Sequence, residues 1–480
     1  MTELTQLSVT KLAALIRARS VSPIEVVEAH LRRVEQLNPE LNAVVSLAPD
    51  ALDRAREAEA AIMRSEQTGP LHGIPLTIKD TIETCGLRTT FGSRLRADYV
   101  PQCDAPAVAL LRRAGGIIFG KTNVSEFAMA LTADNPVFGR TNNPHDLTRT
   151  PGGSSGGEAA AISAGLSPAG LGSDLAGSIR VPAHCCGIVG LKPTSNRVPG
   201  GGHLPPLAGI FALGGSLGPL ARSVEDLALL HYVLTAFDPS EKMFVPTASG
   251  HEWRRQNLNG VRVAWYTNDG TVPITKDTKR AVESAAHALG EAGLVPEEVR
   301  PPGIARGPAL WFSLFARAAT DFLRTMYDGR EAEAGPVVRA MLESGDERDD
   351  SSAPELDAAV TERESLRASL IEWMSATPLI IAPIGAVPAL KHGTQKLEIG
   401  GVSVGTFRAF GYSQTFNVYG FPSVCVPAGR AEDGMPIGVQ IVGRPFAENA
   451  VLSAARVVEE TLGGWRPPSE PDSQRARNQL

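Results

Sequence analysis

The sequence alternates short apolar runs with amphipathic segments, and this alternation limits the folds that the chain can adopt. Each apolar run is too short for an ordinary helix and is typical of a buried strand. The runs lie at 74–78, 116–120, 187–191, 261–266, 379–384, 423–427 and 437–443. Segments with helical periodicity lie between them, at 104–115, 223–237, 277–293 and 447–462. The pattern predicts an α/β fold in which helices cover both faces of a central β-sheet.

Residues 22–37 carry the clearest helix start in the chain. Ser22 is the predicted N-cap, Pro23 occupies the first helical position, and Glu25 completes a capping box. We expect three further helices to be capped by Asp104, Ser223 and Asp277.

Composition and charge exclude several classes of protein. The chain is 43% hydrophobic and 20% charged, so it can bury a sizeable core. Its net charge is −6 and it has no long Lys/Arg run, which argues against direct binding to nucleic acid. No apolar run reaches the roughly 20 residues that span a bilayer. We therefore predict a cytoplasmic protein without nucleic-acid or membrane partners, and leave a homodimer open.

The five cysteines are scattered along the chain and form no C-x-x-C pair. This arrangement favours neither a disulfide framework nor a zinc site. Cys185 and Cys186 are interpreted as small buried residues rather than a redox pair. We predict no metal and no cofactor.

The stretch "PGGSSGGE" at 151–158 places glycines and serines directly before a helix-forming segment, so it is not a linker. A phosphate loop would need a lysine where Glu158 stands. Residues 152–156 also satisfy the G-x-S-x-G nucleophile elbow, which requires a preceding strand, but 142–151 is polar and contains prolines. Among nine histidines, His203 and His392 carry little weight as partners of such a serine. The elbow remains an alternative.

A second serine, Ser178, lies in an equally tight setting within "GSDLAGSIRVPA". Residues 152–183 as a whole resemble the signature of the amidase signature family. Further blocks that resemble the family are "GPLHGIPLTIKD", "FGKTNVSEFA", "NPVFGRTNNP", "GIVGLKPT", "FNVYGFPSVCVPAG" and "MPIGVQIVGRPF". The resemblance covers roughly residues 10–460 and is weakest between about 240 and 355.

The resemblance implies the amidase signature fold, with a mixed sheet, and an acyl-transfer hydrolase that uses no histidine. It assigns Ser178 as the nucleophile, Ser154 as a bridging serine after a cis peptide, and Lys79 as the base. Ser154 also belongs to the implied substrate site, together with Ala128. The implied oxyanion hole consists of the backbone N–H groups of Leu175, Ala176, Gly177 and Ser178.

A lysine can accept a proton from serine only when burial keeps its amine neutral. Lys79 ends the apolar strand "IPLTI", which would carry the amine into the interior, and Asp80 should point to the opposite side. We expect Asp174 and Arg180 to form a pair that braces the turn before Ser178. We expect Ser155 to cap the following helix or to donate a secondary hydrogen bond.

The predicted function is a stand-alone amidase that hydrolyses the C–N bond of a linear carboxylic amide, with aryl amides, carbamates and esters also considered. The alternative is the glutamine-hydrolysing A subunit of a tRNA-dependent amidotransferase. The Gly/Pro-rich segment 191–209 favours the first. We assign 1–465 to one amidase domain, with a signature core at 70–240 and 375–450, a variable peripheral region at 240–355 that ends in an acidic surface loop, and a disordered tail at 466–480.

Overall fold

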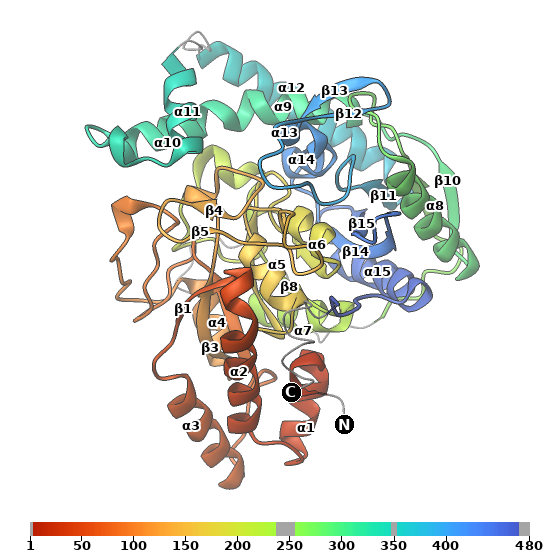
Figure 1. The fold of residues 1–480 in the computed structure, drawn as a ribbon. Helices are drawn as coiled ribbons and strands as arrows, with labels where there is room; N and C mark the ends of the chain where they lie inside the picture. Colours follow the sequence, from red (N-terminus) through yellow and green to blue (C-terminus); the bar gives the residue numbers. More distant parts are fainter. Residues whose placement is uncertain (1–2, 237–254, 347–352, 470–480) are drawn as a thin grey trace.

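The computed structural model describes residues 3–236, 255–346 and 353–469 (Figure 1). Its centre is an 11-stranded sheet with the order β1-β3-β2-β6-β8-β7-β14-β15-β11-β9-β10. In chain order, its strands are β1 (Val44–Leu47), β2 (Pro75–Lys79), β3 (Ile117–Thr122), β6 (Ala169–Asp174), β7 (Val189–Lys192), β8 (Ser216–Ala221), β9 (Arg262–Trp265), β10 (Val295–Glu298), β11 (Leu379–Pro383), β14 (Ser423–Arg430) and β15 (Pro436–Gly443).

The pairing within this sheet is mixed. Strand β2 runs parallel to β3 and β6, whereas β6 runs antiparallel to β8 and β14 runs antiparallel to β15. Two short ribbons lie outside the sheet, β4 (Asp134–Asn135) with β5 (Gly139–Arg140) and β12 (Lys396–Ile399) with β13 (Val402–Gly405). All seven predicted apolar runs overlap strands of the large sheet, so the predicted fold class is confirmed.

Helices cover both faces of the sheet. One layer contains α7 (Val224–Leu234), α8 (Lys276–Glu291) and α15 (Glu448–Leu462), and the other contains α5 (Gly156–Ser163) and α6 (Arg180–Cys186). Strand β15 lies between the layers, because a Cβ at Gly438 would face His184 of α6 while one at Gly443 would face Val451 of α15. Successive residues of a strand alternate between faces, so these two contacts lie on opposite sides.

The N-terminal part adds α1 (Val9–Arg17), α2 (Pro23–Leu41), α3 (Ala51–Met63) and α4 (Pro106–Arg113). A second group of helices gathers at one end of the molecule (Figure 1). It consists of α9 (Gly307–Trp311), the π-helical turn η6 (Phe312–Ala316), α10 (Arg317–Tyr327), α11 (Pro336–Asp346) and α12 (Ala353–Trp373). The short α13 (Thr406–Ala409) and α14 (Gly411–Val418) lie beside it.

The helix caps test the local predictions one by one. The capping box at Ser22 and the cap at Ser223 are confirmed. The caps predicted at Asp104 and Asp277 are wrong: α4 begins after Ala105, and α8 is capped by Thr275. Asp104 instead accepts a hydrogen bond from the Cys85 N–H and pairs with Arg112. In both helices the predicted acid lies within two residues of the observed cap. Local sequence patterns do not distinguish between capping positions this close together.

Within the peripheral region 240–355, the described residues supply β9 and β10 to the sheet and most of the second helix group. The middle half of the acidic loop predicted at 344–355, residues 347–352, lies outside the described residues, as do residues 470–480 of the predicted tail. The two ends of that loop, 344–346 and 353–355, are helical and belong to α11 and α12. Among the helices that are described, none is both long and apolar enough to cross a membrane.

Candidate active site

Lys79 ends β2 in the interior of the sheet, between β3 and β6, as its apolar sequence context predicts. The side chain is fully buried. Its Nζ lies 2.7 Å from Ser154 Oγ and 2.8 Å from Ser173 Oγ. The next residue, Asp80, points away and accepts hydrogen bonds from the N–H and hydroxyl of Thr90. Two serines are therefore the hydrogen-bond partners of the lysine.

Burial changes the protonation of this lysine. Loss of hydration lowers the pKa of Lys79 from 10.5 to about 7, and the carboxylates of Asp174 and Glu158 oppose part of that shift. Glu158 is itself buried, which raises its pKa to about 7, and it accepts hydrogen bonds from Thr77 and Thr122. Near neutral pH, a substantial fraction of the Lys79 side chain is thus a neutral amine able to accept a proton.

Ser154 reaches Lys79 from the glycine–serine loop. The peptide bond between Gly153 and Ser154 is cis, and α5 begins two residues later at Gly156. The chain before the loop forms turns and isolated bridges rather than a strand, so the geometry of a nucleophile elbow is not present. Ser155 precedes α5 without a side-chain cap, and its hydroxyl instead donates to the Ser173 carbonyl at 3.3 Å.

Asp174, at the end of β6, organises the turn that leads to Ser178. Its carboxylate accepts the N–H groups of Gly177 at 2.8 Å and Ile179 at 3.1 Å. Gly177 has φ +97°, a conformation that favours glycine. The Arg180 guanidinium pairs with the same carboxylate at 3.0 Å, and both side chains are fully buried. Burial alone would raise the pKa of Asp174, but the charge and hydrogen bonds of Arg180 hold it well below its ordinary value.

The turn brings Ser178 beside the glycine–serine loop, where its carbonyl accepts the Ser155 N–H at 3.2 Å. Ser178 is 7% exposed, and it lines the same cavity as Ser154. Because the Gly177 N–H already donates to Asp174, three of the four N–H groups assigned to an oxyanion hole have no acceptor among the described residues. These belong to Leu175, Ala176 and Ser178.

The cavity in front of the two serines has a volume of about 360 Å³. Ala128 lines it, as the family resemblance implies, and its other walls are mainly apolar. They include Phe127, Met129, Leu175, Phe211, Trp311 and Phe315. Apart from His203, the only ionisable side chain among the described lining residues is Asp174, which is already paired with Arg180.

Two residues at the site were not assigned from the sequence. Ser173 contacts Lys79 directly, and its place beside Asp174 in the "GSDLAGS" motif was a usable signal. His203 contacts Ser173 at 2.9 Å through Nε2, although the sequence gives it no distinguishing context. No hydrogen bond joins His203 to Ser154 or Ser178 among the described contacts, so it is not placed as their base.

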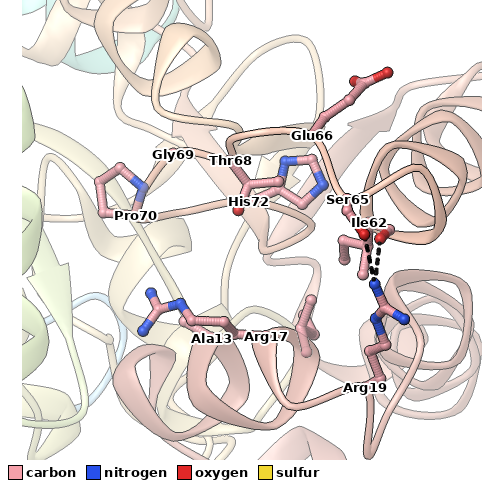
Figure 2. A pocket seen from close by; sticks show the side chains of 11 residues that line it. Ala13, Arg17, Arg19, Ile62, Ser65, Glu66, Thr68, Gly69, Pro70 and His72 are labelled. Carbon is pink, nitrogen blue, oxygen red and sulfur yellow. Dashed lines mark hydrogen bonds between the residues drawn. The ribbon is translucent and has the colours of Figure 1, made fainter.

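A second cavity, of about 160 Å³, lies between α1 and the segment that follows α3 (Figure 2). Figure 2 shows Arg19 donating to the Ile62 carbonyl and the Ser65 hydroxyl across its rim. Its lining residues do not pair a serine with a lysine. Over the described part of the chain, no cluster of three His, Cys, Asp or Glu side chains could hold a metal ion.

Comparison with known proteins now identifies the family. The amidase family model matches residues 25–452, and the chain therefore belongs to the amidase family. The A subunit of glutamyl-tRNA(Gln) amidotransferase from Carboxydothermus hydrogenoformans is 34% identical, over 95% of this chain and 98% of that protein.

Two solved structures extend the similarity to the fold. One is a chain described as part of "an unexpected vestigial protein complex" that "reveals the evolutionary origins of an s-triazine catabolic enzyme". It has a TM-score of 0.89 and 30% identity and covers 96% of this chain and 100% of its own. The other is the A subunit of glutamyl-tRNA(Gln) amidotransferase from Thermotoga maritima, with a TM-score of 0.82, 28% identity and coverage of 98% and 99%.

These relatives contradict two predictions made from the sequence. The first is the stand-alone amidase, and the second is the set of partners, which excluded nucleic acid and allowed at most a second copy of the chain. Both are wrong, since several relatives that match nearly the full chain are named as subunits of an amidotransferase for glutamyl-tRNA(Gln). Segment 191–209 misled because a Gly/Pro-rich loop can vary while the rest of the fold stays unchanged. Net charge describes only the chain's own surface and says nothing of contacts that other subunits make.

Proposed function

We propose that this chain is the amide-hydrolysing A subunit of a tRNA-dependent amidotransferase and that it releases ammonia from the side-chain amide of glutamine. The observation that carries the proposal is the 34% identity to such a subunit over 95% of the chain. The buried contact between Lys79 and Ser154, at the cavity that Ser178 also lines, supports the proposal.

In the proposed reaction, Ser178 Oγ attacks the amide carbonyl carbon and forms a tetrahedral intermediate. The Ser178 proton passes to Ser154 Oγ, and the Ser154 proton passes to the neutral Nζ of Lys79. The resulting ammonium returns a proton through Ser154 to the leaving nitrogen, the C–N bond breaks, and ammonia departs. Water then attacks the acyl-enzyme by the same relay, which releases the carboxylic acid and restores Ser178.

The intermediate carries a negative charge on the former carbonyl oxygen. We assign its stabilisation to the N–H groups of Leu175, Ala176 and Ser178, which the turn around Asp174 leaves without an internal acceptor. Loss of one such donor costs about 10²- to 10³-fold in kcat in other enzymes. Arg180 contributes through Asp174, since this buried pair fixes the turn that presents the donors.

We also propose how the chain is organised and where it works. The catalytic set lies in the proposed signature core, at 70–240 and 375–450, within a single amidase domain at 1–465. The peripheral region at 240–355 lines the cavity through residues such as Trp311 and Phe315 and so contributes to substrate selection. A subunit that serves glutamyl-tRNA would work in the cytoplasm.

Ammonia release tests the proposal. The purified chain is assayed with glutamine alone, with the partner subunits of an amidotransferase, and with those subunits plus glutamyl-tRNA(Gln). We expect release to rise with the partners and again with the charged tRNA, and to vanish in every arm for Ser178→Ala.

The apolar cavity supplies a sharper control. Free glutamine brings an ammonium and a carboxylate that need partners, whereas pentanamide is an uncharged amide of similar length. Two results together would show that the proposed amidotransferase role is wrong. The chain alone would hydrolyse pentanamide faster than the full assembly hydrolyses glutamine, and adding the partner subunits would leave the rates of hydrolysis of both amides unchanged.

A further inference from the structure

A buried chain of hydrogen bonds extends from Lys79 through Ser173 and His203 to the Pro205 carbonyl. Lys79 Nζ lies 2.8 Å from Ser173 Oγ, and Ser173 Oγ lies 2.9 Å from His203 Nε2. His203 Nδ1 in turn lies 2.7 Å from the Pro205 carbonyl oxygen. All three side chains are at least nine-tenths buried, so water competes poorly for these bonds.

The Pro205 carbonyl, at the end of this chain of hydrogen bonds, fixes the direction of each bond in it. A carbonyl oxygen can only accept, so His203 Nδ1 must carry the hydrogen that binds Pro205. Burial, and the charge of Lys79 while that amine is protonated, lower the pKa of His203 to about 3, which keeps the ring neutral. In a neutral ring with hydrogen on Nδ1, Nε2 is an acceptor. Ser173 must therefore donate its single hydroxyl hydrogen to His203.

The direction of these hydrogen bonds also decides whether Lys79 donates to Ser173 or accepts from it. Once the Ser173 hydrogen points to His203, its oxygen faces Lys79 only as an acceptor, and Lys79 must donate an N–H to it. A neutral amine has two N–H donors and one lone pair. With Ser173 unable to donate to that lone pair, the lone pair remains available for the proton of Ser154, 2.7 Å away.

We propose that His203 is a positioning residue that, through Ser173, orients the amine of Lys79 so that its lone pair faces Ser154. The proposal rests on the serine–lysine relay of the proposed function, though not on glutamine or on any partner chain. The main chain around His203 is suited to the role, because it is tied to the segment that follows Lys79. Glu83 N–H donates to the Gly202 carbonyl at 2.8 Å, and Leu204 N–H donates to the Thr81 carbonyl at 3.2 Å.

The test is a double-mutant cycle read out by the labelling of Ser178 with a fluorophosphonate, which needs neither glutamine nor partner subunits. The variants are His203→Leu, Ser173→Ala and the double variant. We expect His203→Leu to slow labelling at least tenfold, because Ser173 can then donate to the Lys79 lone pair. In the Ser173→Ala background the same change should alter the rate less than twofold, since the competing donor is gone.

The pH profile separates positioning from a packing defect. The charged groups that face Lys79 are Asp174 and Glu158, and neither changes in these variants. In His203→Leu, the hydroxyl that donates to the amine stabilises its neutral form, so the ionisation that controls labelling should move to lower pH. His203→Gln, whose amide oxygen can accept from Ser173, should recover part of the rate. His392→Leu, outside the site, is the matched control and should leave the profile unchanged.

The outcomes distinguish the two proposals. Additive losses in the cycle, or a slower His203→Leu variant with an unmoved ionisation, would overturn the positioning role while leaving the serine–lysine relay intact. A wild-type chain that is not labelled at Ser178 would overturn both. Normal labelling behaviour in a chain that never releases ammonia from glutamine would overturn only the proposed amidotransferase role.

Discussion

Two regions meet at the cavity, and they are built in different ways. On the sheet side, Lys79, Ser154 and Asp174 are polar or charged, at most 1% exposed, and held by direct hydrogen bonds. On the side of α9 and η6, the wall is aromatic, and Phe312 is 42% exposed. One hydrogen bond of 2.7 Å, from Trp311 Nε1 to the Leu175 carbonyl, joins the aromatic wall to the turn that leads to Ser178.

This difference separates two tasks. A buried polar network tolerates little change, because a group that loses its partner remains desolvated and unpaired. An apolar wall is non-directional, and its members can be exchanged at a cost set mainly by lost contact area. We therefore expect substitutions on the sheet side to abolish chemistry or stability, and substitutions on the helical side to alter which substrate is used.

The largest expected effect comes from the nucleophile. Ser178→Ala should lower kcat by about 10³-fold or more, as loss of a nucleophilic serine does elsewhere. The melting temperature should stay within about 2 °C of the wild type, because one hydroxyl is removed and no charge is left unpaired. Ammonia release and thermal unfolding of the same preparation check both halves of the prediction. Activity that survives in Ser178→Ala would move the nucleophile elsewhere.

The second-largest effect is expected from Lys79, the proposed base. Lys79→Arg should be nearly as inactive as Lys79→Ala, with both at least about 10²-fold below the wild type. Arginine keeps the positive charge but cannot release its proton at any working pH. Steady-state kinetics of the two variants distinguish a proton acceptor from a fixed charge. If Lys79→Arg keeps most of the activity, the lysine serves as a charge alone.

The buried pair on the sheet side is expected to control stability. Asp174→Ala leaves Arg180 buried without its carboxylate, which should lower the free energy of unfolding by about 3 to 5 kcal/mol. The matched control is Glu362→Ala, which breaks a pair with Arg306 that is 54% and 37% exposed. Chemical denaturation should show a loss of less than about 1 kcal/mol for this control. Equal losses for the two variants would remove the distinction between the regions.

The smallest effect should come from the aromatic wall. Trp311→Ala enlarges the cavity and removes the bond to Leu175, so we expect KM to change about tenfold while kcat falls much less. Trp465→Ala is a control of the same type at a tryptophan packed against Arg222. A loss in kcat as large as that of the Lys79 variants would show that the aromatic wall takes part in the chemistry.

The features that the sequence predicts correctly are local ones. The capping box at Ser22 and the apolar strand that buries Lys79 both depend on a few adjacent residues. Strand β6 is not predicted by the sequence pattern because it consists largely of small residues. A small residue is required at Gly170, since a Cβ there would clash with Thr77 and Glu158. The contact between Ser173 and His203 joins positions 30 residues apart, and no local pattern encodes it. Assembly with other chains depends on surfaces that composition does not describe.

The central claim is that a neutral lysine activates Ser178 through Ser154, and the rate of fluorophosphonate labelling as a function of pH tests it most directly. Activity requires the unprotonated amine, whose fraction rises as pH increases through the Lys79 pKa of about 7. We predict a label on Ser178 alone, at a rate that rises with pH through one ionisation near that value and then levels off. A label on Ser154 or Ser155, or the same ionisation in Lys79→Ala, would contradict the account.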